Sequence, residues 1–550
     1  MQRNRVRRFC WLLLGLPLVL WTACGGGPEK TASSDTGSTA PQRGGTLSLG
    51  FTADITGVNP YASQSSILTS EIAGLQFLRL LDEQPNSTDQ PARLEPRLAT
   101  RWEMSPDGKT VTFHLRDGVQ WSDGAPLTAE DVRFTWQAQT HPDVAWNAAH
   151  YKDDITDVEV VDPVTVRFHS RRPAANLMLW INEGVIIPKH AWGQLPFTEW
   201  RKNSDFFRDH LVTAGPYRMV SWKPQQELVL ERNPRYFDPE RPYIDRLIFR
   251  VVPDQTSLLN QVLAGGLDII AGLTAADVAR VEQSERVRPV GFWSRAHAFV
   301  AWNGRQPLFS DPEVRKALTL AIDRQAIVEV TYGSRYGRVA YSPVVSQCWA
   351  ANRELKPLPY DPQQAREILT RLGFTDGNGD GIVEYNGKPF RFSLMTNTGN
   401  QQRADAVTLI QAQLRKVGID AQPQLMAFNA MNERLDRGDY DAVLVRWTMP
   451  TDLDLSFAFS SEADGAAGNV FGYASPEMDH LLEEALAQTT LDGLAEKVKA
   501  VQALVYRDQP ATYLYESQDL MAVTRRLRDV KANELERLWH LWEWWLAPAS

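Results

Sequence analysis

Three oxygen-bearing side chains alternate along a glycine-rich segment of this chain. Asp376, Asn378 and Asp380 are each followed by a glycine, and calcium loops place their oxygen ligands at such alternate positions. The twelfth position of a calcium loop carries a bidentate glutamate, but this chain has Gly387 there, and Glu384 falls at the ninth position. The segment is therefore either a weak calcium site or a tight turn of aspartate and glycine, and we predict no other metal site.

Motifs of the common catalytic and metal centres are missing from the sequence. It contains no Gly-x-Ser-x-Gly elbow, no phosphate-binding GxxxxGK[ST] loop and no His-Glu-x-x-His zinc pair. Of the three cysteines, Cys10 lies in an apparent targeting segment and Cys24 follows it, which leaves Cys348 without a disulfide partner. We therefore predict that the protein is not an enzyme and carries no cofactor.

Acidic residues outnumber basic ones, and the formal net charge is −9. Contact with phosphates needs a clustered basic surface, and the one basic cluster lies at the extreme N-terminus, so nucleic-acid binding is not expected. Hydrophobic residues make up 43% of the 550 residues. Such a chain can bury large cores, and its length indicates several domains or sub-domains.

The N-terminus has the three parts of an export signal. Four arginines within residues 2–8 precede an apolar run over residues 9–20, which is too short to span a bilayer comfortably. The run ends in small residues before Cys24, which resembles the lipobox of bacterial lipoproteins, although Trp21 stands where Leu, Val or Ile is usual. We predict that residues 1–23 are a signal peptide and that Cys24 is lipidated. Ordinary cleavage, with Cys24 unmodified, is the alternative.

The segment after this cysteine has the composition of a flexible tether. Residues 24–41 are rich in Gly, Ser, Thr and Pro and almost free of apolar side chains. Such a tether suits a folded body held by a lipid at the membrane surface. The protein is therefore expected to be exported and anchored to the cell envelope, and not to span the membrane.

The folded body is predicted to mix strands with helices. Residues 45–51, 111–115 and 158–168 alternate or cluster apolar residues like strands and are separated by Gly, Pro and Asp turns. Residues 311–332 and 402–416 carry apolar stripes at helical spacing. The fold class is therefore α/β or mixed α+β.

Four stretches in a fixed order carry a family resemblance: residues 98–138, 213–237, 302–333 and 360–382. Throughout residues 42–550 the chain resembles bacterial extracellular solute-binding proteins of family 5, the oligopeptide-, dipeptide- and nickel-binding subunits of ABC importers. The resemblance implies a two-lobe periplasmic-binding-protein-like fold with a hinge.

The division into lobes follows from the same resemblance. Lobe I is expected to be discontinuous, with residues 42–79, 203–298 and 510–550. An extra sub-domain, residues 80–202, is inserted into lobe I, and lobe II covers residues 299–509.

The implied function is capture of a solute for import. A monomeric protein would enclose peptides or peptide-like solutes between its lobes and deliver them to a membrane permease, while separate ATPase subunits hydrolyse ATP. It would work in the periplasm or at the outer face of the cytoplasmic membrane. Alternatives are a solute-sensing or chaperone-like lipoprotein of the same fold, or a binder of nickel chelates or oligosaccharides.

In this family the strand and loop corresponding to residues 438–457 line the ligand cleft, and many peptide-binding members have an aspartate three residues after the tryptophan. That aspartate pairs with the ammonium group of the peptide. Here Trp447 is followed at that spacing by Pro450, so Asp452 or Asp454 is expected to substitute. Recognition of a free amino terminus stays open. Trp447 is predicted to stack on the ligand, and core packing is its alternative.

Four further residues are predicted to contact the ligand. Asn59 and Tyr61 follow the first strand, Asn397 precedes the second helix, and Asn303 follows another strand. Turn formation or helix capping are the alternative roles of these residues. The aromatic C-terminal segment, residues 537–547, is expected to dock on lobe I because its four tryptophans need burial, with a membrane-facing belt as the alternative.

Overall fold

The computed structural model describes residues 40–62, 66–85, 90–91, 93–463, 465–466 and 468–548. The predicted signal peptide and Cys24 lie outside the described residues. The described part of the chain is a mixed α/β structure, as the sequence predicts. No helix in these ranges combines the length and the apolar character needed to cross a membrane.

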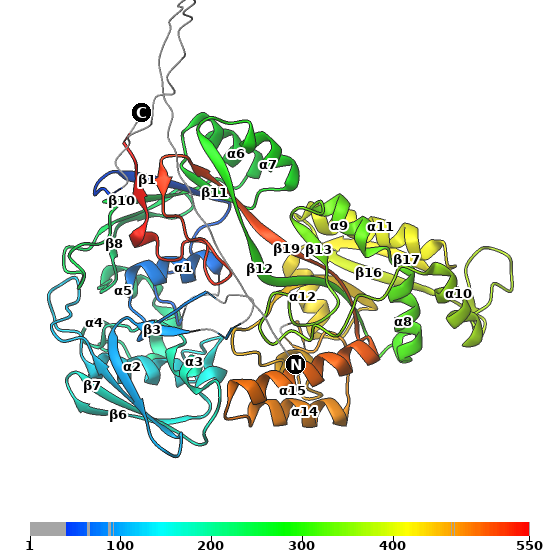
Figure 1. Cartoon of the computed structure of the whole chain (residues 1–550), viewed down its shortest axis with the longest axis horizontal. Helices are drawn as coiled ribbons and strands as arrows, with labels where there is room; N and C mark the ends of the chain where they lie inside the picture. Colours follow the sequence, from blue (N-terminus) through cyan, green and yellow to red (C-terminus); the bar gives the residue numbers. More distant parts are fainter. Residues whose placement is uncertain are drawn as a thin grey trace, which may run out of the picture. The chain divides into compact units, whose positions relative to one another are not determined.

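One long sheet runs through the described chain (Figure 1). Its strand order is β17-β16-β18-β12-β19-β11-β1-β10-β9-β8, and β13 pairs with β19. The bounds are β1 Thr46–Phe51, β8 Tyr217–Lys223, β9 Glu227–Arg232, β10 Arg246–Val251, β11 Ile269–Ala271, β12 Val287–Trp302, β13 Gly337–Val339, β16 Arg391–Asn397, β17 Asp420–Met426, β18 Ala442–Thr448 and β19 Ala511–Thr524.

The antiparallel pair β12 and β19 connects the two halves of this sheet. The second half of β12 pairs with β18, whereas the end of β19 pairs with β11. These are the longest strands, and both continue from one half of the sheet into the other. In the part of the chain that the structure describes, this is the only strand pair that both halves of the sheet share, so it is the place where they can move relative to each other.

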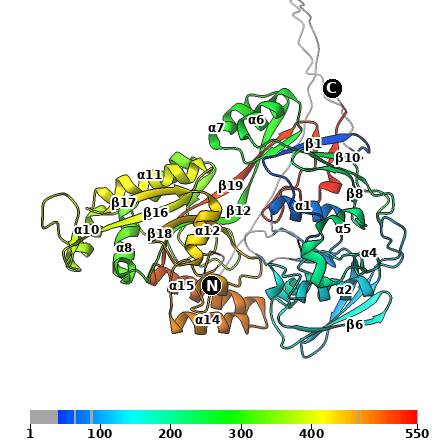
Figure 2. The same ribbon diagram turned by 180° about the vertical axis from the view of Figure 1, so that it is seen from behind.

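The first half of the sheet shares a hydrophobic core with the inserted segment. A four-stranded sheet of order β4-β5-β7-β6 carries α2 on one face, and its buried side chains join those of β1 and β10 in one cluster. The elements of this part are β2 Leu81–Glu83, β3 Leu94–Pro96, β4 Ala99–Met104, β5 Thr110–Leu115, β6 Ile155–Asp162, β7 Thr165–Ser170, α1 Ile67–Gln76, α2 Ala129–Thr140, α3 Leu177–Asn182, α4 Lys189–Trp192, α5 Ser204–Asp209, α6 Gln255–Ala264 and α7 Ala275–Glu282. Figure 2 shows this part from behind.

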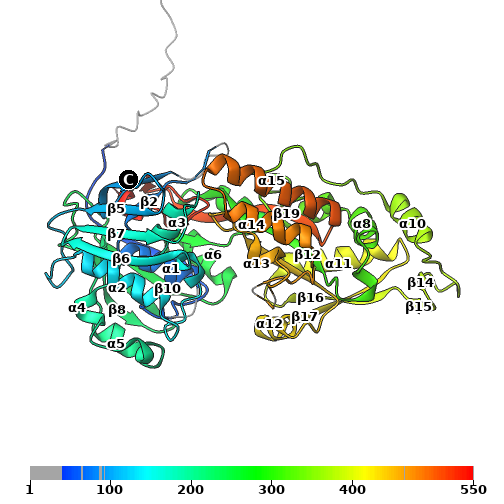
Figure 3. The same ribbon diagram turned by 90° about the horizontal axis from the view of Figure 1, so that it is seen from below.

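The second half of the sheet is packed between two hydrophobic clusters, one on each face. Helices α14 and α15 pack side by side (Figure 3). The remaining elements are α8 Pro312–Ala321, α9 Arg324–Thr331, α10 Pro362–Arg371, α11 Gln401–Arg415, α12 Phe428–Asp436, α13 Ser456–Phe459, α14 Pro476–Leu486, α15 Leu491–Asp508, and the short strands β14 Glu384–Tyr385, β15 Lys388–Pro389, β20 Leu527–Arg528 and β21 Trp545–Leu546.

The predicted helix over residues 311–332 is wrong in one respect, because it is two helices. Asp311 caps α8 by accepting a hydrogen bond from the Glu313 backbone N–H at 2.8 Å, as the sequence suggests. The helix then stops at Ile322, which is extended. Asp323 caps a new helix by accepting from the Ala326 N–H at 3.0 Å. The apolar stripe continues across the break, so periodicity alone conceals it.

The C-terminal segment docks as predicted. Trp542, Trp544 and Leu546 are buried in the cluster that contains the first half of the sheet. Trp545 donates a hydrogen bond from Nε1 to Asp529 at 2.7 Å. Earlier in the same segment, His540 lies 3.4 Å from Asp82 of β2 and Arg537 donates to Glu71 of α1 at 2.9 Å, so the segment is held against both elements.

Candidate functional site

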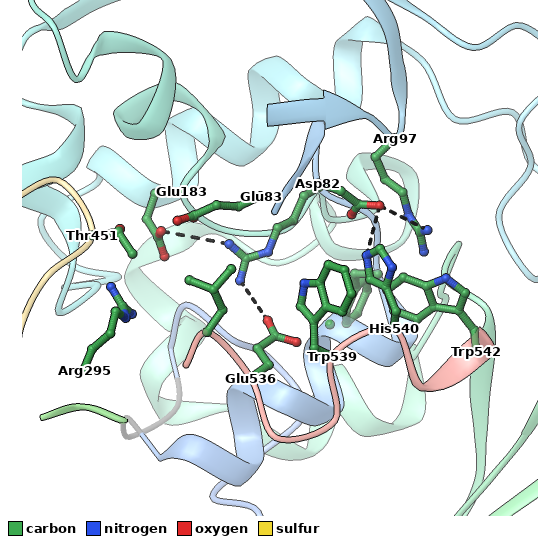
Figure 4. A pocket seen from close by; sticks show the side chains of 14 residues that line it. Asp82, Glu83, Arg97, Glu183, Arg295, Thr451, Glu536, Trp539, His540 and Trp542 are labelled. Carbon is green, nitrogen blue, oxygen red and sulfur yellow. Dashed lines mark hydrogen bonds and ion pairs between the residues drawn. The ribbon is translucent and has the colours of Figure 1, made fainter. Parts of the chain in front are cut away.

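A cavity of about 190 Å³ lies beside the β12–β19 pair and is lined mainly by charged side chains. Its walls come from the end of α1, strand β2, β12, the loop after β18 and the docked C-terminal segment (Figure 4). The lining residues are Gly74, Phe77, Arg79, Asp82, Glu83, Arg97, Glu183, Arg295, Thr451, Leu535, Glu536, Trp539, His540 and Trp542. Arg295 and Thr451 contribute from the hinge strand and from the second half of the sheet.

Local structure explains why these side chains face the cavity. The Leu81 N–H donates a hydrogen bond to Asn182 Oδ1 at 2.9 Å, which holds strand β2 in place. The next two residues of this strand, Asp82 and Glu83, line the cavity. On the opposite side, Leu538 and Leu541 are buried. Glu536 and His540 lie beside these anchors and line the cavity.

Arg79 links two of the carboxylates. Its guanidinium lies 4.0 Å from Glu183 and 3.6 Å from Glu536. Burial raises the pKa of Glu536 to about 7, and Arg79 offsets this only in part. The single charge of Arg79 therefore does not fully offset the cost of burying two carboxylates, because burial weakens the solvation of all three charges.

A second ionic group occupies the other end of the cavity (Figure 4). Asp82 lies 3.5 Å from Arg97 and 3.4 Å from His540. Burial would raise the pKa of Asp82, but Arg97 and His540 together outweigh it and hold this pKa below its usual value. Burial likewise opposes protonation of His540, yet its ion pairs with Asp82 and Glu543 raise its pKa. This group is internally paired, and Arg97 also stacks over Trp542 at 4.1 Å.

Glu83 and Arg295 differ from the paired groups because they form no ion pair within the described ranges, and each also has a buried atom without a hydrogen-bond partner there, as His540 and Trp542 do. In Glu83 the atom is Oε1, and in Arg295 it is NH1. Burial raises the pKa of Glu83 to about 7, and the positive charges of Arg295 and Arg79 lower it only in part. Both groups line the cavity. Unpaired buried polar atoms are rare in proteins and favour a role in binding.

An apolar pocket lies next to the charged cavity, across the loop that follows β18. Trp447 and Phe457 form part of its wall, with ring centroids 5.3 Å apart, and His297 and Tyr513 also line it. His297 Nδ1 and the Tyr513 hydroxyl are buried without a hydrogen-bond partner within the described ranges. The space is only about 10 Å³, enough for about one water molecule. Burial lowers the pKa of His297 to about 3, so its imidazole is neutral.

Asp452 does not point freely into the charged cavity. It is 2% exposed, its Oδ2 accepts a hydrogen bond from Trp180 Nε1 at 2.9 Å, and its carbonyl accepts one from Asn176 Nδ2 at 2.6 Å. Burial and the nearby charge of Asp454 raise the pKa of Asp452 to about 6. Asp454 accepts from the Ser456 N–H at 2.8 Å. Ligand contact by either aspartate stays a prediction.

Asn59 and Tyr61 are both 2% exposed and pack in the core of the first half of the sheet. Asn59 Oδ1 accepts from the Tyr61 N–H at 2.9 Å, which is the turn-forming alternative. The Tyr61 hydroxyl donates to the Val185 carbonyl and accepts from Gln139 at 3.1 Å. Neither residue lines the charged cavity.

Asn303 and Asn397 lie at the far end of β12 and at the end of β16. Asn303 is 1% exposed and donates to the Tyr440 carbonyl at 2.8 Å. Asn397 accepts from Arg403 and donates to the Thr398 carbonyl at 2.8 Å, whereas Asn400 is the residue that caps α11. Of the seven predicted ligand residues, Trp447 lines the apolar pocket and none lines the charged cavity.

The calcium-like loop brings its acids together, but they bond within the loop. Ligand atoms of Asp376, Asp380 and Glu384 lie within 4.8 Å of one another. Asp376 accepts from the Gly379 N–H at 2.7 Å, and Glu384 accepts from Asn378 Nδ2 at 2.7 Å. The loop thus has the bonds of the tight-turn alternative, and the exposed acids carry no further evidence of an ion.

The sequence analysis missed Glu83, Arg295 and Glu536. Glu83 and Glu536 are acids in short polar segments without periodicity, and their burial depends on contacts between distant parts of the chain. A usable signal was the mixture of charged residues and tryptophans near residue 540, because charges within an aromatic segment that docks are buried with it.

Comparison with known proteins gives a consistent result. The family model of bacterial extracellular solute-binding proteins, family 5 middle, matches residues 93–469. The oligopeptide-binding protein AppA of Bacillus subtilis is 28% identical over 553 residues, which cover 100% of both chains. The heme-binding protein A of Haemophilus influenzae is 27% identical over 454 residues, or 79% of this chain and 80% of that one.

A solved structure supports the same assignment. The structure of Bacillus subtilis AppA in complex with a nonapeptide has a TM-score of 0.78 at 28% identity and covers 92% of this chain and 100% of that chain. The chain therefore shares the fold of that structure over nearly its whole length. The family model spans more than half of the chain, and this protein therefore belongs to the bacterial extracellular solute-binding proteins of family 5.

Proposed function

We propose that this protein is the extracytoplasmic solute-binding component of an ABC importer and captures peptides or peptide-like solutes. The observation that carries the proposal is the charged cavity at the hinge strands, with walls from both halves of the sheet. The oligopeptide-binding relative, similar over its full length, supports the peptide class. Binding requires no catalytic group, because delivery needs only closure around the solute and later release.

Closure uses the β12–β19 pair as the hinge. Contacts that would hold the closed form join α3 and its flanks to the opposite part of the chain: Trp180 and Asn176 donate to Asp452, and the Ala175 N–H donates to the Gln488 carbonyl at 2.8 Å. A solute that contacts both sides favours the same arrangement, since it binds the closed form more tightly than the open form.

For the lobes we propose the boundaries expected from the sequence. Lobe I consists of residues 42–79, 203–298 and 510–550. The inserted sub-domain consists of residues 80–202, and lobe II consists of residues 299–509. The separate core clusters of the two halves of the sheet support this division. Strand β12 crosses the boundary between residues 298 and 299, whereas β19 lies within residues 510–550. The first residues of β19 nevertheless pack in the clusters of the second half of the sheet, and Met521 and Val523 pack in the cluster of the first half.

The proposal also covers where the protein is located, which subunits it works with and which residues contact the ligand. A lipid on Cys24 anchors the monomeric protein to the cell envelope, in the periplasm or at the outer face of the cytoplasmic membrane. A permease and ATPase subunits receive the solute. In the cleft, Trp447 stacks on the ligand, while Asp452, Asp454, Asn397, Asn59, Tyr61 and Asn303 are secondary ligand candidates whose present bonds are structural.

Identification of bound material tests the proposal. Mass spectrometry of solutes that co-purify with the protein should identify peptides, and calorimetry with the same peptides should give saturable binding. Co-purification of an oligosaccharide or a nickel chelate in place of peptides would contradict the peptide class. Hydrolysis of bound peptides by the pure protein would contradict a role limited to binding.

A further inference from the structure

The strongest unexplained feature of the cavity is the buried carboxylate of Glu83. Its Oε1 has no hydrogen-bond partner among the described residues, although it lines a cavity large enough for several water molecules. An ionised carboxylate that is buried without a counter-ion is costly. The position therefore favours a positively charged group that arrives from outside the chain.

The charges around Glu83 also call for a cation. Glu183 lies close enough to raise the pKa of Glu83, and the two side chains extend toward each other (Figure 4). Arg79 is already shared between Glu183 and Glu536. Arg295 makes no ion pair with Glu83 in the described structure and keeps its NH1 unpaired. This half of the cavity thus contains three carboxylates but only two guanidinium groups, those of Arg79 and Arg295.

We propose that this cavity binds a primary ammonium group of the solute, with Glu83 as its main counter-ion and Glu183 as a second acceptor. A primary ammonium is compact and has three donors, which suits two carboxylates on neighbouring walls. The unpaired NH1 of Arg295 is available to a carbonyl oxygen of the same solute. An ammonium group close to a carbonyl is the chemistry of a peptide amino end, so this assignment rests on the proposed function.

The position of Glu83 fits the presence of Pro450 where many peptide-binding members of the family have an aspartate. Thr451, the next residue, lines the cavity, so the loop reaches the site without offering a carboxylate there. Asp452 is bonded to Trp180 instead. Glu83, on the opposite wall, supplies the buried acid that the loop does not.

The raised pKa of Glu83 provides a further mark of such a site. At pH values below about 7 the empty cavity holds a proton at this carboxyl, because the effect of burial on its pKa outweighs the charges of Arg295 and Arg79, and Glu183 and Glu536 raise the pKa further. An ammonium ligand stabilises the ionised form and displaces that proton. Its affinity should therefore increase as the pH rises through about 7.

Peptides with free or acetylated amino ends test the assignment. A pool of short random-sequence peptides and its acetylated counterpart are compared by native mass spectrometry. The wild type should bind the free pool at least about 30-fold more tightly, as expected for loss of a buried charge contact. Glu83→Gln should remove this preference and leave the acetylated pool unchanged. A preference that survives in Glu83→Gln overturns the assignment while peptide binding itself stands.

A second measurement decides the proposal without peptides. Butylammonium and butyrate serve as probes in ligand-observed NMR, with Glu95→Gln as the matched control on the neighbouring strand, where Glu95 pairs with Asp82 in register. Butylammonium should bind the wild type and the control but not Glu83→Gln. Failure to bind the wild type, or equal binding to Glu83→Gln, overturns the ammonium site. If butylammonium binds but no peptide does, the ammonium site stands and the peptide class falls.

Discussion

Asp452 shows how one side chain can serve the contact between two parts of the chain. Its carboxylate and its carbonyl both accept hydrogen bonds from α3 and its N-terminal flank. A carboxylate placed in this way is satisfied only when the two parts are together. The contact therefore stabilises the closed arrangement more than the open one.

Replacing Trp180 with phenylalanine tests that contact. Trp180→Phe keeps a large apolar ring but removes the Nε1 donor, so the buried Asp452 carboxylate loses a partner. The free energy of unfolding should fall by ~1–3 kcal/mol, measured by urea unfolding. Trp136→Phe is the matched control because Trp136 Nε1 has no hydrogen-bond partner within the described residues. Equal losses in the two variants would show that ring size alone matters.

The pH dependence of stability follows from Glu83 and Glu536. Burial raises both pKa values from 4.5 to about 7, so the folded protein holds protons that the unfolded chain has already released. Between these values the unfolded state binds fewer protons, and the free energy of unfolding must fall as the pH rises. Below 4.5 both states are protonated, and above about 7 both are ionised.

Urea unfolding at a series of pH values measures this effect in the ligand-free protein. Glu83→Gln cannot titrate, so its stability should fall less between 4.5 and about 7 than that of the wild type. Glu95→Gln, half-exposed on β3, controls for a change of surface charge. Parallel curves for Glu83→Gln and the wild type would rule out a raised pKa at Glu83.

At the scale of elements, Gly215 shows why a position before a strand can accept only glycine. A Cβ atom at this position would lie 2.5 Å from the Gln76 carbonyl carbon and 2.8 Å from its oxygen. The same backbone contact includes a hydrogen bond from the Gly215 N–H to the Gln76 carbonyl at 2.7 Å. The end of α1, which lines the cavity, is thus held against the chain that enters β8.

Alanine at this position should move the end of α1. Gly215→Ala is expected to cost more than ~1 kcal/mol of stability, because the clash is with backbone atoms that cannot rotate away, and thermal unfolding measures it. Gly266→Ala is the control, since its Cβ would meet only the Gln261 oxygen at 3.5 Å. An unchanged melting temperature for Gly215→Ala would contradict the close packing.

Local patterns predicted the elements better than the site. The alternation of residues 45–51 matches β1, and the capping box of Thr128 and Asp131 begins α2 as its spacing suggests. These signals lie within a few residues of one another. Arg295 and Glu536, in contrast, are separated by most of lobe II in the chain and meet only through docking of the C-terminal segment. No local pattern reports such a contact.

At the scale of the whole molecule, β12 and β19 carry the coupling between lobes. Arg338, from β13, donates to Glu516 on β19 at 2.7 Å and stacks 3.9 Å from the ring of Trp293 on β12. Glu516 is 2% exposed and also accepts from the Ser346 N–H at 2.7 Å. This network stiffens one part of the hinge pair, so bending is confined to the rest of the two strands.

Delivery of a solute also depends on where the molecule is held. If Cys24 carries a lipid, Cys24→Ala should move the protein from the membrane fraction to the soluble fraction of the cell envelope, because the variant cannot carry the lipid. Purified variant and wild type should bind the same solute equally, because the folded body starts well after this cysteine. Cys348→Ala, at a buried free cysteine, is the control and should remain in the membrane fraction. Membrane association that persists in Cys24→Ala would refute the lipid anchor, and a wild type that is already in the soluble fraction would refute it in favour of ordinary cleavage after Ala23.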